Sequence, residues 1–183
     1  MAWGDFVKLR RLWSHTSLHV SRKIQIFNTV ITSRLLYGIA SAWLNASEIC
    51  RLNGFQSRCL RKILGIQPAF FSRISNAVVL SQAAQKPYGQ LLLRQQLVLF
   101  GKVARASSEN PLRYLSFVGD SFRPLADCFI CKQGRPCNDW TRMVLNEALR
   151  LTGSTEHLTG LIGDSRAWRS YIEAKLCFLL CDF

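Results

Sequence analysis

Apolar residues at helical spacing limit what this 183-residue chain can fold into more than any other feature of its sequence. In the segment 20–37 they recur at steps of four, three, four and four residues, which places them on one face of a helix. These positions are Val20, Ile24, Phe27, Ile31 and Leu35. We therefore expect an amphipathic helix over 20–37 that buries this face.

A second helix is expected after Ser47, which can cap a helix N-terminus, and its end is marked by Gly65 and Pro68. The inward stripe of this helix consists of Ile49, Leu52, Phe55, Cys59 and Ile63.

Two further helices are expected over 72–85, ending before Pro87, and over 88–106, where Asn110-Pro111 prevents continuation. The inward residues of the second of these are Leu92, Leu93, Leu97, Phe100 and Val103.

Turn residues divide the chain into three expected segments. Because strand-like alternation is absent, the fold class should be all-α. We expect a helical domain over 1–106 and a small helical connector over 139–183, with connector helices over 139–151 and 165 to about 181. The segment 107–138 contains Ser-Ser, Asn-Pro, Gly-Asp and Arg-Pro pairs and is expected to be an irregular linker.

Positive charge is concentrated in the first two thirds of the chain. Lys and Arg number 24 against 11 Asp and Glu, a formal charge of +13. Up to Arg123 there are 17 basic and 4 acidic residues, and beyond it there are 7 of each. A localised positive field on a foldable segment indicates a partner with a phosphate backbone.

Apolar runs are too short for a membrane span, because Arg, Lys, Gln, Asn or Ser interrupts every candidate. We therefore expect no membrane partner. Charged residues also interrupt the stretch at the N-terminus where a secretory signal would be apolar, so we expect an intracellular protein of the nucleus or cytoplasm.

Basic residues fall at helical spacing on three of the expected helices. Arg51, Arg58 and Lys62 are within roughly 40° of one another around the helix axis. Each of the other two helices carries a basic pair eleven residues apart, which shares an azimuth. The residues expected to contact phosphates are Lys23, Arg34, Arg51, Arg58, Arg61, Lys62, Arg94, Lys102 and Arg105. The alternative for each stripe is an ordinary solvated helix face.

Residues for catalysis are not apparent. The basic part has only four scattered carboxylates and no phosphate-binding loop or nucleophile motif, so we expect no enzyme activity, no cofactor and no small-molecule substrate. The spacing of Cys128, Cys131 and Cys137 is a weak candidate for zinc. Because no fourth ligand lies at a suitable distance, we expect unligated thiols instead.

Four aromatic residues are candidates for stacking on nucleic-acid bases. Their positions on apolar stripes favour the core instead. They are Tyr37, Trp43, Phe55 and Phe100.

A series of motifs occurs in a fixed order along residues 10–172. It consists of Trp13, Lys23-Ile24-Gln25-Ile26-Phe27, Leu35-Leu36-Tyr37-Gly38 with Trp43, the run from Leu52 to Ile66, Arg73-Ile74-Ser75-Asn76, Phe100-Gly101-Lys102-Val103-Ala104-Arg105, Gly134-Arg135-Pro136 leading to Trp140, and Asp164-Ser165-Arg166-Ala167-Trp168-Arg169. This order resembles the region just downstream of the palm in non-LTR (LINE-type) retrotransposon reverse transcriptases. Where that family commonly has Gly-His followed by Arg, this chain has Gly101-Lys102 followed by Arg105.

The resemblance implies a helical thumb followed by a connector, the part of the polymerase that grips template and growing duplex. It also implies that the catalytic palm would lie upstream of Met1, or would be supplied by a separate palm-containing polypeptide. We therefore expect non-specific binding to the backbone of RNA, RNA–DNA or DNA duplex.

Two alternatives stay open at this stage. The chain could be a helical protein-interaction module that binds a partner through the helices around Trp140 and Trp168. It could also be a non-functional remnant of a decayed element, because an isolated thumb would expose the apolar surface that normally packs on a palm.

Overall fold

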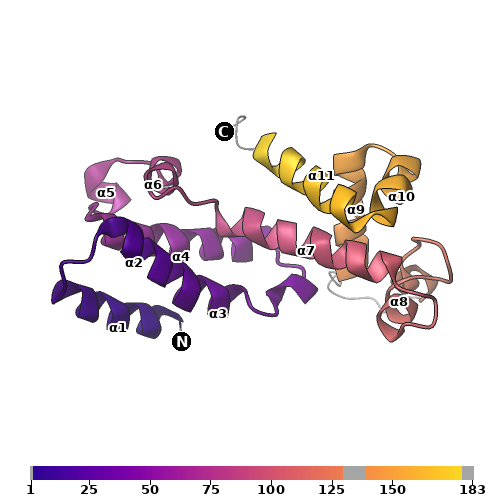
Figure 1. Cartoon of the computed structure of the whole chain (residues 1–183), viewed down its shortest axis with the longest axis horizontal. Helices are drawn as coiled ribbons and strands as arrows, with labels where there is room; N and C mark the ends of the chain where they lie inside the picture. The colour runs from indigo at the N-terminus through magenta and orange to yellow at the C-terminus, as the bar shows by residue number, and fades with distance from the viewer. Residues whose placement is uncertain (1, 130–138, 179–183) are drawn as a thin grey trace. The chain divides into compact units, whose positions relative to one another are not determined.

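The computed structural model describes residues 2–129 and 139–178 of the chain, and these residues are helical without any strand (Figure 1). The only β-type contact among them is an isolated bridge between Phe117 and Pro124. The all-α expectation is confirmed. None of the helices in these two ranges is long and apolar enough to cross a membrane.

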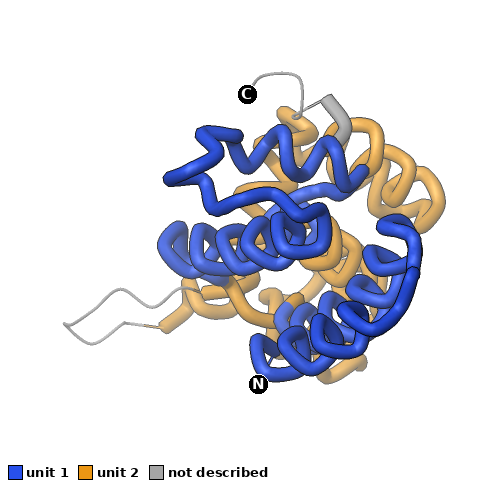
Figure 2. The backbone as a smooth tube through the Cα atoms, turned by 90° about the vertical axis from the view of Figure 1, so that its left-hand side faces the viewer, with its two compact units in different colours: residues 1–39, 44–92 blue, residues 40–43, 93–183 orange. Residues whose placement is uncertain are grey.

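The chain divides into two compact units, coloured separately in Figure 2. Unit 1 comprises 1–39 and 44–92, and unit 2 comprises 40–43 and 93–183. The division falls inside a single helix, α7 (Tyr88–Arg105). The three segments expected from the sequence have their boundaries after residues 106 and 138 instead, and those boundaries stay a prediction.

Unit 1 is built around α4. Its helical elements are α1 (Ala2–Ser14), α2 (Val20–Phe27), the π-helical turn η1 (Asn28–Thr32), α3 (Ser33–Leu36), α4 (Ala46–Leu64), α5 (Ala69–Ser72), α6 (Asn76–Gln82) and the start of α7. The helix α4 packs against α2 and α6, and α1 packs against η1. The elements α2, η1 and α3 follow one another without a break, so the helix expected over 20–37 is present with a π-helical turn inside it.

The core of unit 1 uses the apolar faces that the sequence predicted. Ile24, Phe27 and Ile31 are buried, and the ring of Phe27 meets that of Phe6 edge-on at 5.9 Å. Phe6 comes from α1, a helix that the sequence did not predict.

Two helix starts differ from the sequence predictions, and side-chain caps explain both. The N-cap of α4 is Asn45 rather than Ser47, because Asn45 and Glu48 exchange side-chain-to-backbone hydrogen bonds of 2.8 and 2.9 Å in a capping box. The helix expected over 72–85 starts only at Asn76, because Arg73 adopts a left-handed conformation with φ 54° and Ser75 caps α6.

Unit 2 contains the rest of α7, α8 (Pro111–Ser116), the 3₁₀ turn η3 (Leu125–Cys128), α9 (Trp140–Thr152), α10 (Thr155–Gly163) and α11 (Ser165–Phe178). A further 3₁₀ turn, η2 (Ile39–Ser41), lies where the chain passes between the units. The expected helices over 88–106 and 139–151 are confirmed by α7 and α9. The helices α8 and α10 were missed, and α8 lies inside the segment expected to be an irregular linker.

Candidate nucleic-acid interface

A groove runs along the exposed face of α4. Two neighbouring hollows form it, with volumes of about 410 and 470 Å³, and they share Gly54 and Arg58 in their walls. Both hollows lie entirely within unit 1. The groove is therefore continuous past the middle of α4.

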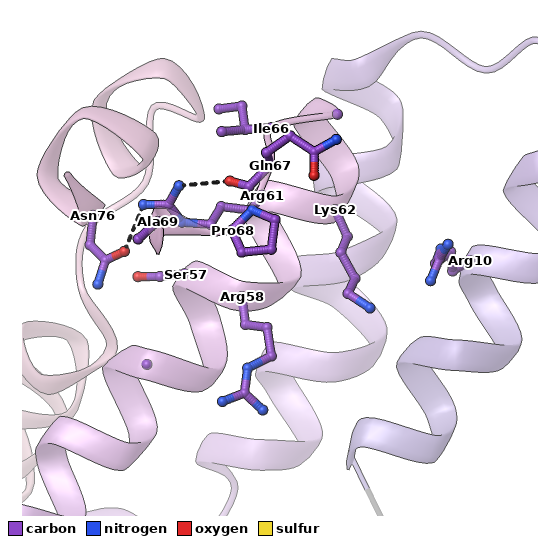
Figure 3. A pocket seen from close by; sticks show the side chains of 12 residues that line it. Arg10, Ser57, Arg58, Arg61, Lys62, Ile66, Gln67, Pro68, Ala69 and Asn76 are labelled. Carbon is purple, nitrogen blue, oxygen red and sulfur yellow. Dashed lines mark hydrogen bonds between the residues drawn. The ribbon is translucent and has the colours of Figure 1, made fainter. Parts of the chain in front are cut away.

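Four exposed cations line this groove, Arg10 from α1 and Arg51, Arg58 and Lys62 from α4, and the buried Arg61 of α4 is a fifth lining residue. All four are exposed, and none forms an ion pair with a carboxylate in the part of the chain that the structure describes. Figure 3 shows Lys62 extending from α4 toward Arg10 on α1. The predicted stripe on α4 thus faces solvent, and Arg10 adds a cation that the sequence did not single out.

No acidic residue lines the groove. Unit 1 has twelve Lys and Arg but only two carboxylates, giving +10 of the total +13. Both carboxylates are engaged elsewhere, Asp5 with Arg34 at 3.1 Å and Glu48 in the cap of α4. The electrostatic potential of the groove must therefore be positive, and mobile anions from solvent are its available counterions.

Trp3 supports two of the groove cations from α1. The Arg58 guanidinium carbon and Lys62 Nζ lie 5.8 and 4.9 Å from the centroid of the indole ring. These cation–π contacts hold both charges over one ring without neutralising them. The sequence offered no signal for this pairing, because α1 itself was not predicted.

Gly54 forms part of the floor of the groove. It lies in the interior of α4, where glycine costs about 1 kcal/mol of helix stability relative to alanine. Nothing lies within 4 Å of the position where its β-carbon would be, so packing does not require glycine there. The missing side chain leaves the two hollows connected.

Arg61 does not belong to the exposed stripe. It is 6% exposed, and its guanidinium donates to the Gln67 carbonyl oxygen and to Oδ1 of Asn76 (Figure 3). It also donates to the Ile74 carbonyl oxygen at 2.5 Å. A further bond goes to Ser72 Oγ at 3.3 Å. These bonds tie the 65–76 segment to α4. Arg61 thus has a structural role, and its expected phosphate contact stays a prediction.

The expected pair on α2 and α3 is separated by a change in helix type. The π-helical turn η1 lies between Lys23 and Arg34, so a count of 100° per residue does not hold across it. Lys23 is half-buried, and exposed Arg34 forms the ion pair with Asp5 described above.

The expected pair on α7 does share a face, and both of its residues have partners within unit 2. Arg94 forms an ion pair with Glu173 of α11. Arg105 donates to the Ile162 carbonyl oxygen at 3.0 Å and to Ser165 Oγ at 3.5 Å. Lys102 between them is exposed. Charge spacing alone could not reveal that the acidic partner comes from the last third of the chain.

Three of the four assessed aromatic residues pack in a core. Phe100 is fully buried, and Phe55 and Trp43 are half-buried against the cores of unit 1 and unit 2. The expectation was wrong for Tyr37, which is 88% exposed. Tyr37 follows the end of α3, where the backbone becomes extended and leaves the helical stripe.

The cysteine motif falls only partly within the described chain. Cys128 is an exposed free thiol, whereas Cys131 and Cys137 lie outside the described residues. Within 2–129 and 139–178 no group of three His, Cys, Asp or Glu side chains could hold a metal ion.

Burial changes the proton affinity of two groups in the core of unit 1. Desolvation raises the pKa of the Cys59 thiol on α4 to about 12, and the positive charges of Arg58 and Lys62 only partly oppose this shift. Desolvation likewise raises the pKa of Tyr88, whose hydroxyl lies 2.5 Å from Thr32 Oγ1. Both groups are therefore neutral at physiological pH and serve packing.

No protein-family model, curated protein or solved structure matches this chain.

Proposed function

We propose that unit 1 binds the sugar–phosphate backbone of RNA, RNA–DNA or DNA without reading its sequence. The observation that carries this proposal is the acid-free groove along α4, lined by Arg10, Arg51, Arg58 and Lys62. Guanidinium and ammonium groups donate charge-assisted hydrogen bonds to phosphate oxygens wherever these occur along a strand.

The length of the stripe suits a polymer better than a single anion. Arg51 and Lys62 are eleven residues apart on α4, a distance of roughly 16 Å along the helix axis. Several successive phosphates of one strand fit within that distance. Release of their counterions would supply much of the binding free energy.

The sequence resemblance to non-LTR reverse transcriptases supports the same role. In that interpretation the chain acts as a thumb and connector that holds a template or duplex, and a palm elsewhere performs the chemistry. We assign a binding role and no catalytic role to this chain. A nucleic-acid partner is consistent with a place in the nucleus or cytoplasm.

The alternative of a protein-interaction module has less support. Trp168 is fully buried, and the indole N–H of half-buried Trp140 donates to the Ala40 carbonyl oxygen at 2.8 Å. The Trp168 indole is therefore enclosed in the core of unit 2, and the Trp140 indole is only partly accessible.

The test measures binding of labelled 20-nucleotide RNA, DNA and duplex by fluorescence anisotropy between about 50 and 300 mM salt. The triple variant Arg51→Gln/Arg58→Gln/Lys62→Gln should weaken binding to all sequences and reduce the slope of log K against log salt by about two units.

A matched control removes three exposed cations outside the groove, through Arg123→Gln/Arg166→Gln/Arg169→Gln. This control should change the slope far less. Equal losses in both triple variants would mean that only net charge matters, and binding that is insensitive to salt would refute the proposal.

A further inference from the structure

One end of the α4 groove is a hollow whose walls come from several elements of unit 1. It has a volume of about 410 Å³ and is bounded by α1, the C-terminal half of α4 and the turn 65–69. Its cations come from two helices, Arg58 and Lys62 from α4 and Arg10 from α1 (Figure 3). This volume lies within the range of small-molecule sites and is too small for a duplex.

Two amide side chains also line this cavity. Gln67 and Asn76 line it, and both are exposed. Arg61 holds the backbone carbonyl of Gln67 and the side-chain oxygen of Asn76 through bonds of 3.2 and 3.1 Å. The cations of the cavity can therefore bind a phosphate, and its amides can hydrogen-bond to the polar edge of a nucleotide base.

Two exposed phenylalanines follow the cavity wall directly. Pro68 and Ala69 line the cavity, and Phe70 and Phe71 come next in α5, 87% and 73% exposed. Their rings meet edge-on at 5.3 Å. The hydrogen bonds of Arg61 to Gln67 and Ile74, on either side of α5, tie the backbone that carries these rings to α4.

We propose that this end of the groove binds an unpaired nucleotide of a single strand, and that unit 1 consequently prefers single-stranded nucleic acid to duplex. The cations Arg10, Arg58 and Lys62 take the phosphate, and the base stacks on the Phe70–Phe71 pair. This inference rests on the proposed function and adds the strand state of the ligand. In a duplex the base faces are stacked on one another, whereas an unpaired base can stack on an exposed aromatic ring.

The test uses four labelled 20-mers of equal length: single-stranded RNA, oligo-dT, a duplex, and an abasic strand that keeps the phosphates but lacks the bases. Wild type should bind oligo-dT and RNA about fivefold or more tightly than the abasic strand and the duplex. The variant Phe70→Leu/Phe71→Leu should lose this preference while keeping the salt slope, and Phe70→Tyr/Phe71→Tyr should retain it.

Tyr114→Leu on α8 is the matched control, because Tyr114 is 70% exposed and lies in unit 2. It should leave the preference unchanged.

If duplex, abasic and single strands bind wild type equally, or if the Leu variant retains the preference, the inference is overturned while the proposed function stands. If the Leu variant changes only self-association in size-exclusion chromatography, the phenylalanines serve a protein interface and the inference is also wrong. Absence of salt-dependent binding to every strand would instead remove the proposed function.

Discussion

Gly101 of α7 lies against the indole of Trp168 of α11, so closely that a β-carbon at Gly101 would be 2.5 Å from Trp168 Nε1. The same indole N–H donates to the Leu97 carbonyl oxygen at 2.9 Å, one turn earlier on α7. Trp168 is fully buried at the centre of the core of unit 2. Two motifs that are 60 residues or more apart in the sequence thus form one packing contact.

Gly101→Ala should therefore destabilise unit 2 by about 1 to 3 kcal/mol, because the added methyl group forces the indole or the helix to shift. Gly160→Ala on α10 is the control, since nothing lies within 4 Å of its β-carbon position. That change should be neutral or stabilising by up to about 1 kcal/mol. Urea unfolding measures both. Equal effects at the two glycines would contradict the packing described for Gly101.

Replacement by methionine should lower protein stability at Arg61 but mainly nucleic-acid binding at Arg58. Arg61→Met removes a buried guanidinium and leaves its acceptors in the 65–76 segment without this donor, and we expect a loss of about 2 to 4 kcal/mol in the free energy of unfolding. Arg58→Met removes an exposed charge and should change stability by no more than about 0.5 kcal/mol while weakening nucleic-acid binding. A stable Arg61→Met protein would argue against the structural role.

Two substitutions at Gly54 should affect stability and nucleic-acid binding differently. Gly54→Ala should raise the free energy of unfolding by up to about 1 kcal/mol, because alanine favours the helix and has open space around it. Gly54→Gln should fold as well but narrow both hollows and weaken strand binding severalfold. Thermal unfolding and anisotropy on the same samples test this pair. Unchanged binding in Gly54→Gln would mean that no ligand approaches the middle of α4.

Stability should fall at alkaline pH because of Cys59. Its pKa is raised from 9.0 to about 12, so the folded state keeps a proton that the unfolded state releases above pH 9. The stabilisation is fully present below pH 9 and is lost between pH 9 and about 12, with a slope of up to about 1.4 kcal/mol per pH unit from this group. Urea unfolding from pH 8 to 10.5 measures the slope. Cys59→Ala should be less stable at pH 8 but show a shallower decline.

The groove was partly predictable from the sequence because one regular helix carries most of it. Arg51, Arg58 and Lys62 lie on α4, where the count of 100° per residue applies from end to end. The same count was wrong for Lys23 and Arg34, because a π-helical turn lies between them. The local sequence pattern did not show that a π-helical turn would shift the angular positions of the residues that follow it.

The sequence alone determined the helical class, the apolar faces of α2, α4 and α7, and the excess of positive charge before residue 124. These properties depend on neighbours within a few residues or on composition. Tertiary structure decided which cations stay available: Arg61 is enclosed by the 65–76 segment, Arg94 and Arg105 are bound by α10 and α11, and Arg10 and Trp3 join the groove from α1. The physical reason is that a side chain's exposure and its partners are set by residues that packing brings to it from distant parts of the chain.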